Sequence, residues 1–414
     1  MKRLIVRGAA VVAMAGSLAG CPATDDGTVP LFQVEALWPQ PLEYPNILGP
    51  VSGVTVAPDG NILILTMSAR ELFSAANEIN TLTGTGECCT PVPGVVEFAA
   101  DGSLVRQWGG PDVQGWPSRP HGIGVDPEGN VWIGGSTFTP PPAGGRGGRG
   151  ARGADPNAPP PPPPTPVYDT HILKFSRTGD LLATIGTPGA TPSSASTNSF
   201  GGPADFSFDA DAGEVYVADG YVNHRVVVLD MATGAVKRSW GAYGNTPDDA
   251  PQGPHDPAAP PSQQFRRVTC AELSNDGLVY VCDQGHNRIQ VFETDGTFVE
   301  EVVIKGSTLG NGSVRDIAFS NDEDQRWLFV TDGMNERVHI LFRNTLELKT
   351  SFGIGGRYPG NFRELGGIAV DAAGNIYTAE DGQGRRVQLF RNIGIGPVPS
   401  EDQGPLHPQA TGGM

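Results

Sequence analysis

The first candidates for chemistry in this chain are one tyrosine and one histidine. Tyr221 lies at the tip of VADGYVNHRVVVLD, residues 217–230, where a short acidic turn separates two apolar runs. His121 begins an apolar stretch in RPHGIGVDPEGNVW. A tyrosine can act as a general base and an imidazole can bind a metal, but an unperturbed tyrosine, with a pKa near ~10, is a poor base at neutral pH. The alternative is structural: Tyr221 lines a surface by its shape, and His121 is a strand-start residue bound to water.

The other side chains that could do chemistry show no common spacing. The remaining histidines are scattered over apolar stretches, turns and Pro-rich loops: His171, His224, His255, His286, His339 and His407. The chain contains no CxxC or Cys/His zinc spacing, no serine nucleophile elbow, no phosphate-binding loop and no dinucleotide-binding glycine pattern.

Residues 1–20 are predicted to be a signal peptide and not part of the fold. MKRLIVRG carries three basic residues, and the apolar run over 9–19 is too short to span a membrane. The run ends in LAGC, residues 18–21, which resembles the bacterial lipobox, in which the peptide is cut before a cysteine that becomes lipidated. The alternative is an ordinary secretory peptide whose cleavage site precedes a cysteine.

Lipidation of Cys21 predicts attachment of a soluble domain to the bacterial cell envelope through the lipid alone. Pro22 and Ala23 follow the cysteine where an inner-membrane protein would carry Asp, which favours the outer membrane. Residues 21–30 are then a linker.

An exported chain can keep disulfides. Cys270 and Cys282 flank Asn275-Asp276-Gly277, a hairpin turn signal that places them opposite each other. They form either a cross-strand disulfide or two free buried thiols. Cys88 and Cys89 are adjacent and are not expected to bridge each other.

The composition of the chain argues against some classes of binding partner. A net charge of −17 argues against nucleic acid and anionic membrane surfaces, and 38% hydrophobic residues over 414 positions suffice for a full core. Residues 137–167 are predicted to be a disordered insertion, because its Pro/Gly/Arg-rich sequence can bury almost nothing. Its GGRGGRGARG run resembles an RNA-binding segment, but the acidic, secreted context favours an extended surface loop.

The strongest feature is a unit that recurs six times, at intervals of about forty to fifty residues. Each unit reads as four short alternating strands joined by turns such as DG, NDG or EGN, as in HGIGVDPEGNVWIGG. One such unit cannot bury both faces, whereas six arranged radially can. We therefore predict an all-β, six-bladed β-propeller over residues 31–393, followed by a flexible tail, 394–414. The last unit lacks a full fourth strand, which LFQVEALW, residues 31–38, would supply.

An Asp/Arg pair recurs across the turn between the second and third strands of four units. An ion pair that also binds the turn backbone is the economical explanation, so these residues are interpreted as repeat architecture and not as catalysts. The pairs are Asp219 with Arg225, Asp283 with Arg288, Asp332 with Arg337, and Asp381 with Arg386.

These units resemble NHL repeats over nearly all of residues 45–391, outside the insertion. WPSRPHGIGVDPEGNVWIGG and PADFSFDADAGEVYVADGYVNHRV are more closely similar to the peptidyl-α-hydroxyglycine α-amidating lyase propellers and their bacterial relatives. The resemblance implies a central zinc held by three histidines, a tyrosine base, assisting arginines and a structural calcium in the channel. His121 matches the first zinc histidine, and Tyr221 matches the tyrosine base.

Most other positions of that site do not match. The second and third zinc histidines would fall near Thr269 and at Gly366. One expected arginine is Gln284, another falls near Met67 with Arg70 out of register, and Gly367 stands where the family places an aspartate near calcium. A catalytic zinc normally needs three protein ligands, and without it the alcohol pKa is not lowered.

Two functions therefore remain. The first is a non-catalytic propeller whose rim binds a protein or small-molecule ligand and which needs no cofactor. The second is a divergent zinc-dependent lyase, for which zinc and calcium are expected. The metal content of the purified protein separates the two.

Overall fold

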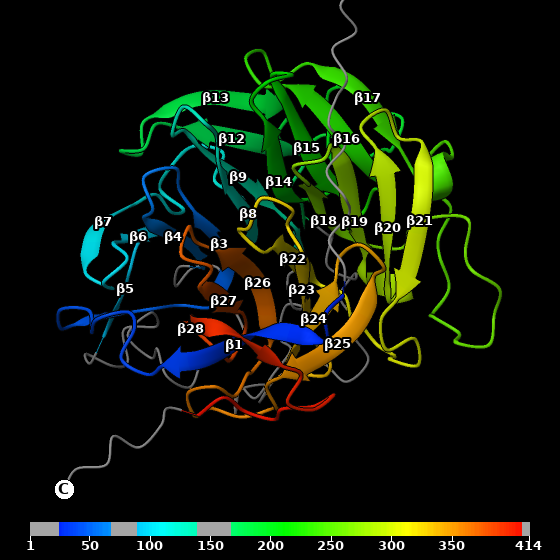
Figure 1. Cartoon of the computed structure of the whole chain (residues 1–414). Coiled ribbons are helices and arrows are strands. Elements are labelled where there is room, and N and C mark those ends of the chain that lie inside the picture. The colour runs from blue at the N-terminus through cyan, green and yellow to red at the C-terminus, as the bar shows by residue number, and fades with distance from the viewer. Residues whose placement is uncertain (1–24, 68–88, 139–166, 408–414) are drawn as a thin grey trace, which may run out of the picture.

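The computed structural model describes residues 25–67, 89–138 and 167–407. The predicted signal peptide, Cys21, Arg70, Cys88 and most of the predicted insertion lie outside these residues. Within them, the chain forms six four-stranded antiparallel sheets that follow one another around a ring (Figure 1). The prediction of a six-bladed β-propeller is confirmed.

Each blade uses four strands, here given from the channel outwards. Blade 1 contains β3 (Val51–Val56), β4 (Ile62–Thr66), β6 (Val95–Phe98) and β7 (Leu104–Trp108); blade 2 contains β8 (Pro120–Val125), β9 (Val131–Gly135), β12 (His171–Phe175) and β13 (Leu181–Gly186); and blade 3 contains β14 (Pro203–Asp209), β15 (Glu214–Asp219), β16 (Arg225–Asp230) and β17 (Val236–Trp240). Blade 4 contains β18 (Val268–Leu273), β19 (Leu278–Asp283), β20 (Arg288–Glu293) and β21 (Phe298–Val303); blade 5 contains β22 (Asp316–Phe319), β23 (Trp327–Asp332), β24 (Arg337–Phe342) and β25 (Glu347–Phe352); and blade 6 contains β26 (Leu365–Val370), β27 (Ile376–Glu380), β28 (Arg386–Pro397) and β1 (Thr28–Glu35).

Four short strands and two turns complete the described elements. β2 (Asn46–Ile47) pairs in parallel with β5 (Thr90–Pro91), and β10 (Thr137–Phe138) pairs with β11 (Val167–Tyr168). Two 3₁₀ turns cover Ala242–Gly244 and Gln284–His286. Strand pairing thus reaches both ends of the predicted insertion, and residues 139–166 lie outside the described residues.

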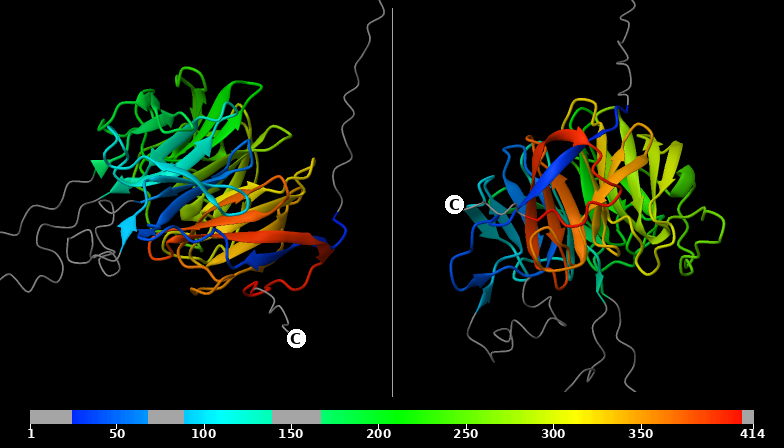
Figure 2. Two further views of the ribbon diagram at one scale, coloured as in Figure 1. Left: turned by 90° about the vertical axis from the view of Figure 1, so that its left-hand side faces the viewer. Right: turned by 60° about the horizontal axis from the view of Figure 1, so that its bottom comes forward.

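The ring closes through strands from the two ends of the described chain. β1 pairs antiparallel with β28, with Gln33 opposite Arg391 and Glu35 opposite Leu389. Both views in Figure 2 show these two strands, blue and red, side by side on one blade. The predicted closing strand is therefore the fourth strand of blade 6, and it begins at Thr28, inside the predicted linker.

The core lies between neighbouring blades. Second strands are buried along their whole length, as in β4 and β15, whereas the outermost strands β7 and β13 are largely exposed. Aromatic side chains near the ends of outer strands pack on the next blade: Trp108 lies 5.0 Å from Phe175, and Trp240 lies 5.9 Å from Phe292, between ring centroids. Where the repeat ends in an aromatic residue followed by Gly, as at Trp108 and Trp240, the aromatic ring joins its blade to the next one.

The predicted flexible tail differs from the structure as far as it is described. Residues 394–397 belong to β28, and the following segment lies against the outer strand of blade 5. The Gln403 amide donates to Ser351 O (2.9 Å), and the Gly353 amide donates to Gly404 O (2.8 Å). The exposed edge of β25 supplies the unpaired backbone groups that make this contact favourable.

The side chains that were predicted to do chemistry lie at one end of the central channel. The start of each innermost strand pairs with the end of the second strand, as Pro120 does with Gly135 and Pro203 with Asp219. His121, Thr269 and Gly366 at the starts of inner strands therefore lie at the same end as the turns that carry Tyr221 and Asp381. We call this end of the channel the mouth. In the described residues, no helix is long and apolar enough to cross a membrane.

Candidate functional site

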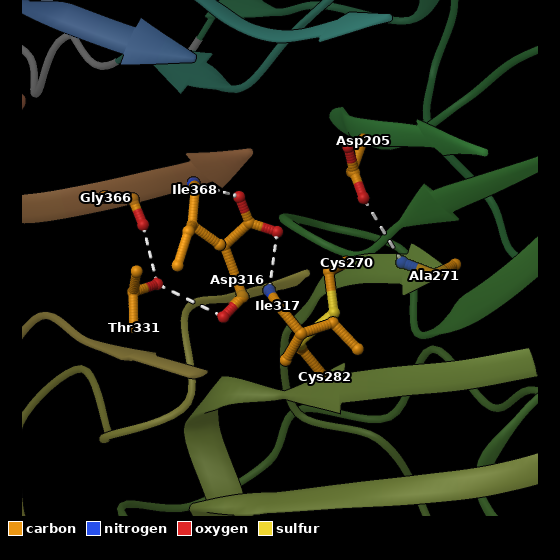
Figure 3. Close-up of a disulfide and its surroundings, with 9 residues drawn as sticks. All are labelled: Asp205, Cys270, Ala271, Cys282, Asp316, Ile317, Thr331, Gly366 and Ile368. Atoms are coloured by element: carbon orange, nitrogen blue, oxygen red, sulfur yellow. Dashed lines mark hydrogen bonds between the residues drawn. A yellow bond between two sulfur atoms is a disulfide. The ribbon is translucent and has the colours of Figure 1, made fainter. Parts of the chain in front are cut away.

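Cys270 and Cys282 form a disulfide between the first two strands of blade 4 (Figure 3). They are register partners in β18 and β19, their Cα atoms lie 4.9 Å apart, and both side chains are fully buried. Of the two alternatives that the sequence left open, the structure contains the cross-strand disulfide.

The predicted Asp/Arg pair is present in blade 3, where it ties a turn to the loop before the blade. Arg225 Nε lies 2.8 Å from Asp219 Oδ2, and both side chains are buried. The guanidinium also donates to three carbonyls of the preceding loop, at Ser194, Ser196 and Ser199. Every polar group of this buried pair therefore has a partner within the fold.

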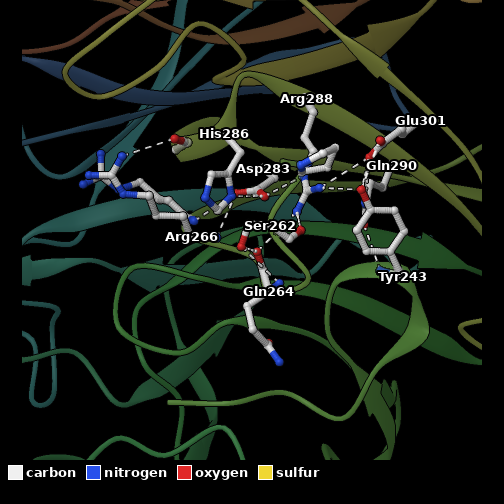
Figure 4. A network of polar contacts seen from close by, with 12 residues as sticks. Tyr243, Ser262, Gln264, Arg266, Asp283, His286, Arg288, Gln290 and Glu301 are labelled. Carbon is white, nitrogen blue, oxygen red and sulfur yellow. Dashed lines mark hydrogen bonds and ion pairs between the residues drawn. The ribbon is translucent and has the colours of Figure 1, made fainter. Parts of the chain in front are cut away.

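Blade 4 repeats this arrangement with more partners (Figure 4). Arg288 Nε lies 3.0 Å from Asp283 Oδ2, which also accepts a bond from His286 Nδ1 at 2.8 Å. The same guanidinium donates to the Tyr243 hydroxyl and to Ser262 O, both at 2.9 Å. These residues position the loops of blade 4, and Ser262, His286 and Arg288 also line a cavity of about 480 Å³.

The two predicted pairs in blades 5 and 6 are wrong. In blade 5, Asp332 contacts His339 (3.1 Å), while Arg337 turns outwards to Asp402, because the C-terminal segment brings that carboxylate against the blade.

In blade 6, Arg386 pairs with Glu380 (2.6 Å) and not with Asp381. The cause is the register: Glu380, opposite Leu365, occupies the place that Asp219 has opposite Pro203. Asp381 is consequently released towards the mouth, where its Oδ2 lies 3.1 Å from Arg315 Nη2 and 3.6 Å from Arg119 Nη2.

His121 and Tyr221 meet at the mouth. The Tyr221 hydroxyl lies 2.5 Å from His121 Nε2, and His121 Nδ1 lies 3.3 Å from Ala204 O. A carbonyl can only accept, so Nδ1 carries the proton and Nε2 accepts from the tyrosine. Both ring nitrogens of His121 are thus engaged within the protein.

Both side chains are neutral at physiological pH. Burial, followed by the charge of Arg315, lowers the pKa of His121 to about 3. Burial raises the pKa of the Tyr221 hydroxyl, against the opposing charges of Arg315 and Arg267. A raised pKa lowers the fraction of the hydroxyl that is ionised at neutral pH, so less of the phenolate that a general base requires is present.

The positions that the lyase resemblance assigns to zinc converge, but their side chains do not fit zinc. A small pocket is lined by Ser52, His121, Ala204, Thr269, Arg315 and Gly366, among others. Arg315 comes so close to Gly366 that a Cβ there would lie 3.3 Å from the guanidinium carbon. A cation next to a single, already engaged imidazole repels Zn²⁺. Among the described residues, no three His, Cys, Asp or Glu side chains are placed to hold a metal.

Three arginines that the sequence interpretation missed lie around Tyr221 at the mouth, and one of them, Arg315, lines this pocket. Arg315 stands at the inner-strand start of blade 5, and Arg119 and Arg267 each precede that position by two residues, in blades 2 and 4. Arg267 lies over the Tyr221 ring, with 5.8 Å from its guanidinium carbon to the ring centroid. Alignment of the repeat starts with one another could have revealed these arginines, because they share a place just before or at the inner strand.

Two carboxyl groups, those of Asp205 and Asp316, line this pocket and also the channel beyond it. Asp316 of blade 5 accepts from the Ile368 amide of blade 6 (2.9 Å), and Asp205 of blade 3 accepts from the Ala271 amide of blade 4 (3.4 Å), as Figure 3 shows. Burial raises the pKa of both groups, and raises the pKa of Glu272 well above its usual value, with Asp205 as the next cause. A cavity of about 600 Å³ reaches these three residues.

Comparisons with known proteins agree with the predicted resemblance to NHL repeats. Residues 200–229, in blade 3, match the family model of the NHL repeat. NHL repeat-containing protein 3 from Mus musculus is 25% identical over 273 residues, covering 64% of this chain and 58% of that protein. The protein of the same name from Homo sapiens is 26% identical over 228 residues, covering 53% and 51%. This chain spans little more than half the length of these relatives.

Two solved structures were also matched. A streptogramin B lyase structure shares 13% identity with a TM-score of 0.45, covering 87% of this chain and 97% of that one. A catalytically inactive virginiamycin B lyase from Staphylococcus aureus with quinupristin shares 14% identity with a TM-score of 0.46, covering 89% of both chains. The chain is a six-bladed β-propeller, as predicted, and the predicted NHL resemblance is confirmed by the repeat match in blade 3 and by the similarity to NHL repeat-containing proteins. The closer likeness to amidating lyases stays a prediction.

Proposed function

We propose that this NHL-repeat propeller is a non-catalytic binding module that is exported, held at the bacterial cell envelope by a lipid on Cys21, and engages its ligand or partner protein at the mouth. The binding role is supported above all by the position of Arg315. Its guanidinium stands beside Gly366, where a third metal ligand would be needed. A binding site can use this cation, whereas a zinc site cannot.

The alternative is a divergent zinc-dependent lyase, and the contact between Tyr221 and His121 is the observation that favours it. The two functions are separated by metal analysis of the mature chain, from Pro22 onwards, after exposure to zinc and dialysis. We expect less than stoichiometric zinc and the same content in His121→Ala. One zinc per chain that disappears in His121→Ala would overturn the binding-module proposal.

The proposed anchor has its own test. The LAGC stretch, residues 18–21, supports lipidation, and the Cys270–Cys282 disulfide supports an oxidising compartment. When a bacterium expresses the full chain, we expect incorporation of labelled fatty acid and recovery with membranes. Cys21→Ser should abolish both, and Cys89→Ser should change neither. Membrane recovery of Cys21→Ser without label would contradict the anchor.

A further inference from the structure

Three guanidinium groups gather at the mouth. Asp205 and Asp316 line the pocket beside Arg315, and burial raises the pKa of both carboxyls, which favours their neutral forms. Arg119, Arg267 and Arg315 surround Tyr221, and Asp381 is the one carboxylate that ion-pairs with any of them in the described part of the chain. Because His121 and Tyr221 are neutral, they do not offset these charges. A local excess of guanidinium groups in a chain of net charge −17 is not explained by its general charge balance.

Arg267 is the arginine left without an ion pair there. Its Nη1 donates to two amide oxygens, Asn311 Oδ1 at 3.1 Å and Gln284 Oε1 at 3.4 Å. Both are neutral acceptors, and the second bond is long. By contrast, the buried Arg225 of blade 3 and Arg288 of blade 4 each have a carboxylate within about 3 Å. The guanidinium of Arg267 therefore retains the capacity to bind an anion.

A second observation comes from Thr269, which follows Arg267 by two residues at the start of the inner strand of blade 4 and faces the pocket beside Arg315. Thr269 is 3% exposed, and its hydroxyl has no hydrogen-bond partner among the described residues. Buried hydroxyls are nearly always paired, and leaving one unpaired costs about 1–3 kcal/mol. An acceptor atom entering from the mouth would satisfy Thr269 and contact Arg315, which lines the same pocket.

We propose that the mouth is a binding site for a carboxylate-bearing ligand, which Arg267 binds through its guanidinium, with Arg315 and the Thr269 hydroxyl completing the contacts. The proposal rests on the binding-module function above and names its ligand class. The planar fork of arginine matches a carboxylate in two parallel hydrogen bonds. Asp381, held between Arg315 and Arg119, disfavours a doubly charged phosphate more than a singly charged carboxylate.

Tyr221 and His121 act as positioning residues for this site. The ring of Tyr221 packs against the guanidinium of Arg267, and its hydroxyl is fixed by His121. A cation over an aromatic face is attracted to it, which restricts Arg267 to one region of the mouth. The pair that resembles catalytic machinery thus orients a binding arginine.

The test is calorimetric titration of the mature chain with three probes: small monocarboxylates with their amides, a short peptide with a free C-terminal carboxylate with its C-terminal amide, and inorganic phosphate. We expect at least one acid to bind about tenfold or more tightly than its amide. The small-acid and peptide arms identify the source of the carboxylate. Equal binding of acids and amides, or tighter binding of phosphate, would overturn the proposal.

Variants connect binding to the named residues. Arg267→Gln should remove the preference for acid over amide, whereas Arg391→Gln, an exposed arginine paired with Glu35, should leave it intact. Thr269→Val should weaken acid binding several-fold without lowering the melting temperature of the ligand-free chain, because its hydroxyl has no partner to lose. A lower melting temperature with unchanged affinity would mean a structural role and would contradict the site.

The zinc content of the same preparations distinguishes a failure of the carboxylate-ligand proposal from a failure of the binding-module proposal. Absent zinc together with absent carboxylate binding would overturn the ligand class and leave the binding-module proposal standing. Stoichiometric zinc would overturn the binding module itself.

Discussion

The channel carboxyl groups show how one residue can act against stability at neutral pH. Burial and the nearby Asp205 raise the pKa of Glu272 well above its usual value. The folded chain therefore holds a proton that the unfolded chain releases, so stability rises as the pH falls through the folded pKa towards about 4.5 and is lost as the pH rises. At neutral pH the ionised carboxylate is the disfavoured state in the channel.

Glu272→Gln should accordingly raise the free energy of unfolding at neutral pH, because the amide fills the same space, keeps a donor towards Asp205 and carries no charge. The gain should shrink as the pH falls towards about 4.5, because the carboxyl of the unfolded wild-type chain then becomes protonated as well. Urea unfolding at both pH values measures the difference. Glu300→Gln, on the exposed face of β21 in the same blade, is the matched control and should change little. A loss of stability in Glu272→Gln at neutral pH would contradict the argument.

At the scale of elements, the turn between the second and third strands depends on its ion pair only where the pair is buried. Arg225→Met should cost roughly 3–5 kcal/mol, because it leaves Asp219 buried without its charge partner and three carbonyls without a donor. Arg337→Met removes a half-exposed contact to Asp402 and should cost less than about 1 kcal/mol. Denaturant unfolding of the two variants measures this difference, and equal costs would show that burial is not the deciding factor.

The same pairs mark the limit of what the repeat pattern predicts. Alternation and DG-type turns determine strand number and blade count, because each strand must bury one face and each turn needs its special residues. The partner of Arg386 depends on a register difference of one residue at Glu380, and the partner of Arg337 depends on a segment 65 residues away. Neither is visible within one repeat.

The location of the pocket at the mouth could be predicted from the sequence, but the charged side chains around it could not. The resemblance placed His121, Thr269 and Gly366 together, and the structure brings them to one pocket. Arg315 and Arg267 could not be predicted from the resemblance, because they stand at positions where it expects no arginine. Their charges decide what the pocket can hold, since a guanidinium beside one imidazole disfavours a metal and favours an anion.

At the scale of the whole molecule, the propeller is held closed by a single strand. β1 buries Val29, Phe32 and Val34 on blade 6, and the Phe32 ring lies 5.6 Å from Phe329 and 5.8 Å from Phe352 of blade 5. Burial of three such side chains contributes about 1.5–3 kcal/mol each, which together approaches the entire stability of a typical domain.

Deletion of residues up to Ala36 should therefore open the ring, expose β28 as an edge and cause self-association, whereas deletion up to Thr24 should leave a monomer with unchanged melting temperature. Light scattering and thermal unfolding of the two truncations give the comparison. A peptide of residues 28–35 added in trans should restore the monomer, and the same peptide with Asp in place of Phe32 should not, because the charge would enter the core between blades 5 and 6. If the longer truncation stays monomeric and melts at the wild-type temperature, closure through β1 is not what holds the ring together, and the contacts between blades must suffice.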